Sequence, residues 1–169
     1  MRFATTSFYK YVNIENPDDL ACKTRNFCRE RKIFGRILIA KEGINAAVSG
    51  ETDSVRDLKD FILSNKFFSD VLFKDQDCDE NVYHKLVVRV RPEIVAFGYP
   101  VNMKNKAEHV SPGKLKEWLD NNEDILLLDA RNKYEFKIGK FKGAQVLPIE
   151  TFKDFPKQSA RLKDKKKRR

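Results

Sequence analysis

Cysteines and long apolar runs are both scarce in this chain of 169 residues. The three cysteines, Cys22, Cys28 and Cys78, are an odd number and form no Cys-x-x-Cys pair, which disfavours a disulfide framework and a zinc site. No apolar run approaches the ~18 residues that cross a membrane, and the N-terminus lacks the apolar core of a secretion signal. We therefore expect a reduced, cytoplasmic protein that is not associated with a membrane.

Charge, in contrast, is abundant: 35% of the residues are charged, and the net charge is +9. More than half of this excess lies in the tail 163–169, which holds six basic residues and one acid. The mild positive charge of the rest is compatible with RNA binding without establishing it. The tail alone fits a nucleic-acid arm, a solvated end, or a segment that joins two elements of a longer fold.

The first part of the chain has the pattern of a ferredoxin-like α+β domain over residues 1–98. Asn16-Pro17 starts a helix, because a capping side chain precedes a proline at the first helical position. The order βαββαβ predicts two helices on one face of a four-stranded antiparallel sheet. The expected strands are 3–12, 33–40, 44–49 and 86–90, with an optional short strand at 71–74; the helices are 17–31 and 51–65, and 75–81 is an acidic loop.

After an expected linker at 99–110, the predicted order of helices and strands changes. Ser111-Pro112 starts a helix, and the apolar strand expected at 125–129 is typical of a parallel sheet covered on both faces. A short helix at 132–137, a strand at 144–147 and a helix start at 151–155 complete an α/β order. We interpret residues 111–169 as the first part of an α/β domain.

One candidate binding site is the turn after the second strand of the first domain. Lys41, Glu42 and Asn45 surround Gly43, a glycine that can take positive φ, and so place a cation, a carboxylate and an amide on one sheet edge. These groups could hold a phosphate and a base edge of RNA. An ordinary hairpin turn is the alternative interpretation.

A second candidate is the last strand of the first domain, where basic residues alternate with apolar ones. Lys85, Arg89 and Arg91 follow Tyr83 and His84. Basic residues interleaved with an aromatic ring on a sheet face suit single-stranded RNA, through phosphate contacts and base stacking. The alternative is a solvated strand face.

Two groups of charged residues remain. The acidic cluster at 75–80 lacks the glycine and distal glutamate of a calcium loop, so we predict no metal site.

Asp129 and Arg131 end the apolar strand of the second domain. There the carboxylate can accept hydrogen bonds from a following helix, and the guanidinium fork can fix a loop. A purely structural role for both is the alternative.

Three segments together resemble the rhodanese-related tRNA uridine 5-hydroxylases. They are Lys41–Asn45 (KEGIN), Lys85–Val95 (KLVVRVRPEIV) and Leu128–Ala144 (LDARNKYEFKIGKFKGA). Their order and spacing match that family, and the resemblance covers almost the whole chain.

The resemblance implies a ferredoxin-like domain followed by a rhodanese domain, and hydroxylation of the tRNA wobble uridine at C5 with molecular oxygen as co-substrate. It implies no metal or flavin, and a catalytic cysteine in a rhodanese loop. The last cysteine here is Cys78, so we expect the catalytic cysteine beyond Arg169 and a truncated, inactive chain. The expected RNA contacts are Lys41, Glu42, Asn45, Arg89 and Arg91.

Two alternatives remain open at this point: a non-catalytic RNA-binding module and a sulfurtransferase-related protein. The sequence leaves the oligomeric state and the identity of the tRNAs undetermined.

Overall fold

A computed structural model describes residues 2–99 and 107–166, with the backbone alone for residues 161 and 163–166. The chain divides into two compact units, Met1–Val95 and Ala96–Arg169, here called unit 1 and unit 2. Most of the linker expected at 99–110 lies outside the described residues, as do the last residues of the basic tail. Each unit is therefore considered by itself.

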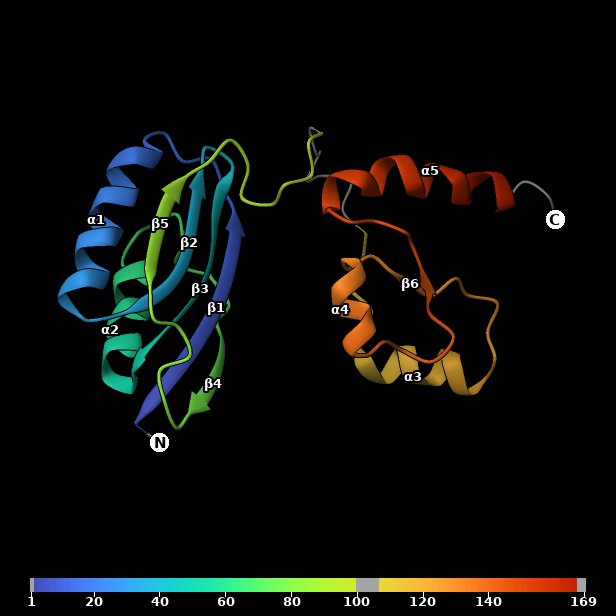
Figure 1. Ribbon diagram of the computed structural model, residues 1–169, viewed down its shortest axis with the longest axis horizontal. Coiled ribbons are helices and arrows are strands. Elements are labelled where there is room, and N and C mark those ends of the chain that lie inside the picture. Colours follow the sequence, from blue (N-terminus) through green and yellow to red (C-terminus); the bar gives the residue numbers. More distant parts are fainter. Residues whose placement is uncertain (1, 100–106, 167–169) are drawn as a thin grey trace. The chain divides into compact units, whose positions relative to one another are not determined.

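Within its described residues, 2–95, unit 1 contains five strands and two helices (Figure 1). The strands form one sheet in the order β4-β1-β3-β2-β5, in which β5 is parallel to β2 and the other pairings are antiparallel. The elements are β1 (Phe3–Tyr11), α1 (Pro17–Glu30), β2 (Phe34–Ala40), β3 (Gly43–Glu51), α2 (Thr52–Leu63), β4 (Lys74–Cys78) and β5 (Leu86–Val90).

The ferredoxin-like α+β prediction is confirmed, but two details of it are wrong. The sheet has five strands and is mixed, because β5 adds to the edge of β2 in parallel. In addition, the expected acidic loop is largely strand β4, which pairs with β1. Aspartate is unfavourable in strands, but β4 lies at a sheet edge, where Asp75 is stabilised by Lys59 at 2.5 Å.

Local signals account for the start and the packing of the helices. The Asn16 side chain accepts a hydrogen bond from the Asp19 N–H at 3.1 Å, as expected of a helix cap followed by Pro17. In α2, Val55, Leu58 and Ile62 recur at helical spacing and are buried.

The core of unit 1 lies between the two helices and one face of the sheet (Figure 1). Alternate residues of each central strand point into it: Phe8 in β1, Ile37 in β2 and Ile44 in β3 are at most 3% exposed. Leu58 of α2 and Phe68 cover them and are fully buried. The described helices of unit 1 leave the other sheet face uncovered.

Unit 2 has short elements and little buried surface. Its two strands pair in parallel, as the α/β order predicts, but the strand expected at 125–129 is reduced to two residues. Of the missing residues 125–127, Ile125 and Leu126 are exposed and so lack the cover that a central strand has. The elements are α3 (Pro112–Asp120), β6 (Leu128–Asp129), α4 (Lys133–Ile138), β7 (Gln145–Val146), the 3-10 helix η2 (Phe152–Asp154) and α5 (Phe155–Lys166).

Candidate functional site

The turn between β2 and β3 depends on a glycine. Gly43 has φ +148°, a conformation that side chains rarely adopt. A Cβ atom there would lie 2.0 Å from the Lys10 carbonyl oxygen on the adjacent strand β1. The turn therefore requires glycine, and it places Lys41 and Glu42 at the end of the sheet.

Glu42 and Asn45 both bind the backbone of Ile94, in the segment that follows β5. The Ile94 N–H donates to Glu42 Oε1 at 2.8 Å, and Asn45 Nδ2 donates to the Ile94 carbonyl at 3.1 Å. Ile94 itself is 1% exposed. The two side chains thus hold the chain where it leaves the sheet, a role that the sequence pattern did not indicate.

The three basic residues expected to contact RNA all have exposed side chains. Arg89 lies in β5 beside Leu38 of β2, and the Arg91 N–H donates to the Ile39 carbonyl at 2.8 Å. Lys41 follows directly after β2. Because β2 and β5 are parallel, their C-terminal ends meet at the same end of the sheet, and this brings Lys41 and Arg91 to that end.

The neighbouring residues Tyr83 and Lys85 contribute their backbone to the sheet. The Tyr83 N–H donates to Ser49 Oγ at 3.0 Å, and the Lys85 carbonyl accepts from the Gly35 N–H at 2.9 Å. These bonds fix the approach to β5 and therefore the position of the basic residues that follow.

Tyr11 lies close to the acidic residues at this end of the sheet. Burial raises the pKa of Tyr11, and the carboxylate of Glu42, the neighbouring Tyr9 and the carboxylate of Glu93 raise it further. The Tyr11 hydroxyl therefore keeps its proton at neutral pH and remains a hydrogen-bond donor.

Asp129 and Arg131 form a closed arrangement in unit 2. Arg131 donates from Nε to Asp129 Oδ1 at 3.0 Å and from Nη2 to Asp129 Oδ2 at 2.7 Å. The same Nη2 donates to the Gly139 carbonyl at 2.6 Å. The Arg131 guanidinium lowers the pKa of Asp129, and Asp129 raises the pKa of Arg131. The pair joins the end of β6 to Gly139, directly after α4, and thereby holds the segment between them, which contains α4.

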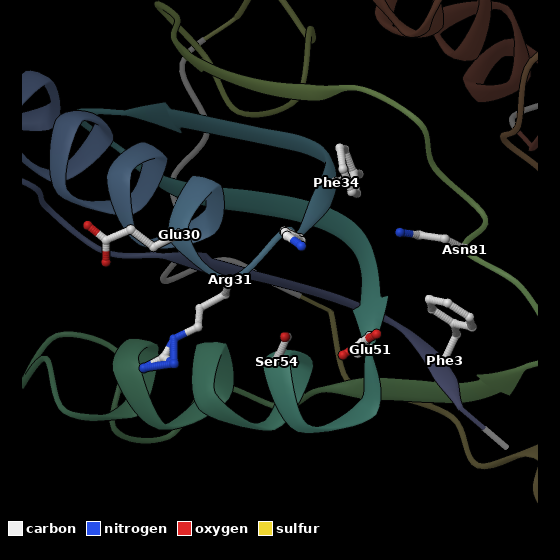
Figure 2. Close-up of a pocket in the computed structure, with 8 residues that line it drawn as sticks. Phe3, Glu30, Arg31, Phe34, Glu51, Ser54 and Asn81 are labelled. Carbon is white, nitrogen blue, oxygen red and sulfur yellow. The ribbon is translucent and has the colours of Figure 1, made fainter.

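A pocket of about 390 Å³ lies between the end of α1 and the start of α2 (Figure 2). Two of its charged groups are already paired: Arg31 with Asp57 at 3.1 Å and Glu51 with Arg2 at 2.9 Å. None of the candidate RNA-binding residues lines it. The lining residues are Phe3, Glu30, Arg31, Lys32, Phe34, Glu51, Ser54 and Asn81.

The cysteines all lie in unit 1. Cys28 is fully buried, and burial raises its pKa to about 12. A sulfur carrier needs an accessible thiolate. Cys28 is inaccessible and keeps its proton, so it is not suited to carry sulfur. Cys22 is exposed and Cys78 is half-buried. Among the described residues, no group of three or more His, Cys, Asp or Glu is placed to hold a metal ion.

The strand order and the two helices on one face define unit 1 as a ferredoxin-like α+β domain with an added parallel edge strand. Residues 3–94 match the family described as UPF0176 acylphosphatase like domain. The chain belongs to this UPF0176 family.

The similarity to curated proteins extends through both units. The chain is 37% identical over 166 residues to the tRNA uridine(34) hydroxylase of Streptococcus agalactiae serotype III (strain NEM316). It has the same identity to the tRNA uridine(34) hydroxylase of Streptococcus pyogenes serotype M5 (strain Manfredo). In both cases the match covers 94% of this chain and 50% of the relative. The chain thus spans about half the length of the curated relatives it matches.

Solved structures give more distant matches. The BLUF protein BlrB in its dark state aligns with TM-score 0.45 and 14% identity over 57% of this chain and 79% of that one. An acylphosphatase from Coxiella burnetii aligns with TM-score 0.37 and 13% identity over 53% and 92% of the respective chains.

In the described part of the chain, no helix has the length and apolar character needed to cross a bilayer.

Proposed function

We propose that this chain takes part in hydroxylation of the tRNA wobble uridine at C5. The observation that carries the proposal is the 37% identity to named tRNA uridine(34) hydroxylases, which runs through both units. The substrate in this proposal is tRNA, and the cellular location is the cytoplasm.

The role of unit 1 in this proposal is to bind the tRNA. Lys41, Arg89 and Arg91 are exposed and supply cations for phosphates. Glu42 and Asn45 support them indirectly, because both hold Ile94 and so fix the segment just after Arg91. In their described positions, Glu42 and Asn45 are positioning residues.

The role of unit 2 is to form part of a rhodanese domain, in which Asp129 and Arg131 fix one loop. Molecular oxygen is the proposed co-substrate. One oxygen atom enters the C5–H bond of uridine, and the other leaves as water after a two-electron reductant supplies two electrons and two protons. The expected cysteine is none of Cys22, Cys28 and Cys78, which all lie in unit 1.

The test measures 5-hydroxyuridine in tRNA from a bacterial strain that lacks its own wobble uridine hydroxylase. The coding sequence is first read past Arg169, and the gene's complete product and the 169-residue chain are expressed side by side. We expect the complete product to restore 5-hydroxyuridine and the chain alone to bind tRNA without modifying it. A complete product that is folded and abundant but leaves the tRNA unmodified would reject the hydroxylase function.

The second candidate function is a non-catalytic RNA-binding module. It is favoured by the well-packed core of unit 1 together with its exposed cations. In the same experiment this candidate predicts tRNA binding by both products and 5-hydroxyuridine from neither.

A further inference from the structure

Strand β5 lies at one edge of the unit 1 sheet, so it has a neighbouring strand on one side only. Its odd-numbered residues turn their backbone groups toward that neighbour, β2. The Lys85 carbonyl accepts from the Gly35 N–H at one end of the pairing, and the Arg91 N–H donates to β2 at the other. Since the backbone groups of successive strand residues point to opposite sides, those of the even-numbered residues, with Val88 at the centre, face the outer edge.

One side chain bonds to this outer edge. Arg25 Nη2 donates to the Val88 carbonyl at 2.9 Å. Arg25 is half-buried and belongs to α1, which contacts β5 (Figure 1). Among the described residues, no other side chain bonds to an outward backbone group of β5. Arg25 is therefore the restraint on the outer side of the strand.

The carbonyl that Arg25 binds belongs to the peptide group between Val88 and Arg89. Val88 is 6% exposed and packs in the core, whereas Arg89 is exposed. Because successive side chains of a strand point to opposite faces, Arg89 leaves the sheet on the face away from α1. Arg25 thus acts on Arg89 through the peptide group that precedes it.

The other restraints on β5 lie on its inner side. The segments before and after it are each tied to β3 or to the turn before β3, through Ser49 in one case and through Glu42 and Asn45 in the other. In the sheet, β3 lies beyond β2 as seen from β5. Arg25 holds the strand from the opposite side, next to Arg89 in the chain.

We propose that Arg25 is a positioning residue for tRNA binding, because its guanidinium holds the Val88–Arg89 peptide group and so sets the direction of the Arg89 side chain. The inference rests on the proposed function for its ligand and adds a residue that acts on the contact surface from behind. A hydrogen bond from a charged donor restrains a carbonyl more strongly than one from a neutral donor. Without Arg25, Arg89 remains in the chain but turns away from the phosphate that it neutralises.

The test is a double-mutant cycle with Arg25→Met and Arg89→Gln in the 169-residue chain, in which fluorescence anisotropy gives each Kd for unmodified tRNA. Methionine keeps an unbranched apolar stem and removes every donor. We expect each single variant to lose one phosphate contact, which weakens binding roughly tenfold at about 0.1 M salt and lowers the salt slope by about 1. In the Arg89→Gln background, Arg25→Met should weaken binding by no more than about twofold further, the usual uncertainty of additive effects.

A second measurement follows β5 without RNA. Hydrogen exchange of residues 86–91 should be faster in Arg25→Met, while exchange in α2 stays unchanged. Arg29→Met is the matched control, since it removes an exposed cation from the next turn of α1 whose guanidinium has no bonding partner among the described residues. It should leave affinity and exchange unchanged. If Arg25→Met also speeds exchange in α2, Arg25→Gln replaces it, because its amide is two bonds shorter and falls short of the Val88 carbonyl.

Several outcomes would overturn the proposal. Additive losses in the cycle would show that Arg25 meets the tRNA itself. Unchanged exchange in β5, wild-type affinity in Arg25→Met, or an equal loss in Arg29→Met would also contradict the positioning role. Self-association of Arg25→Met with unchanged tRNA affinity would assign Arg25 to protection of the sheet edge instead. A wild-type chain that does not bind tRNA would reject the RNA-binding role itself, and the proposal with it.

Discussion

The two units differ sharply in how much of their apolar surface is buried. Unit 1 places Ile37, Ile44 and Leu58 in a shared core with no exposure at all. In unit 2, the buried hydrophobic residues among those described are Ala144, Leu147 and Ile149, and neither α3 nor α4 has a buried residue.

Yet local structure is equally well signalled in both units. Ser111 caps α3 through a hydrogen bond from the Lys114 N–H at 3.2 Å, just as Asn16 caps α1. Ile138 and Phe141, in contrast, are 88% and 63% exposed. Caps and short helices form from neighbouring residues, whereas a core needs several elements that cover one another. Unit 2 therefore forms its helix cap and short helices although tertiary contacts bury little of its apolar surface.

The largest expected difference concerns matched leucines in the two units. Leu58→Ala empties a fully buried position in α2 and should lower the free energy of unfolding by about 2–5 kcal/mol. Leu119→Ala in α3, where the side chain is 37% exposed, should cost less than about 1 kcal/mol. Chemical denaturation followed by circular dichroism measures both. Equal losses of stability would contradict the difference in packing.

A smaller effect is expected from paired glycine substitutions. Gly43→Ala forces a side chain into positive φ and against the Lys10 carbonyl, and should cost on the order of 1–3 kcal/mol. Gly113→Ala in α3 meets no atom within 4 Å and should cost nothing, because alanine favours helix more than glycine does. The same denaturation measurement decides between them. A harmless Gly43→Ala would show that the turn does not need its glycine.

The smallest expected effect is the pH dependence of the Asp129–Arg131 pair. In the folded chain, the pKa of Asp129 lies below the ordinary aspartate value near 3.9. The pair therefore stabilises unit 2 at pH values above the ordinary pKa, and this stabilisation is lost as the pH falls through the folded pKa. Replacing Arg131 by Gln should raise the titration midpoint of the Asp129 carboxyl carbon in NMR spectra. An unchanged midpoint would contradict the role of the guanidinium.

Features that depend on neighbouring residues could be predicted from the sequence. The helix start at Asn16-Pro17, the strand 86–90 and the buried stripe of α2 all follow from local spacing. The parallel addition of β5 to β2 could not be predicted, because it joins residues about 50 positions apart and leaves no local signature.

The candidate site, too, could be predicted from the sequence only in part. The sequence marks Glu42 and Asn45 as polar residues beside a turn, but their bonds to Ile94 exist only once β5 is in place.

The most direct test of tRNA binding by unit 1 is the affinity of the 169-residue chain for unmodified tRNA, measured over a range of salt concentrations. The account predicts that the wild-type affinity falls steeply with salt, and that replacing both Lys41 and Arg89 by Gln weakens binding and flattens that dependence. The same affinity and the same slope in the double variant would contradict it.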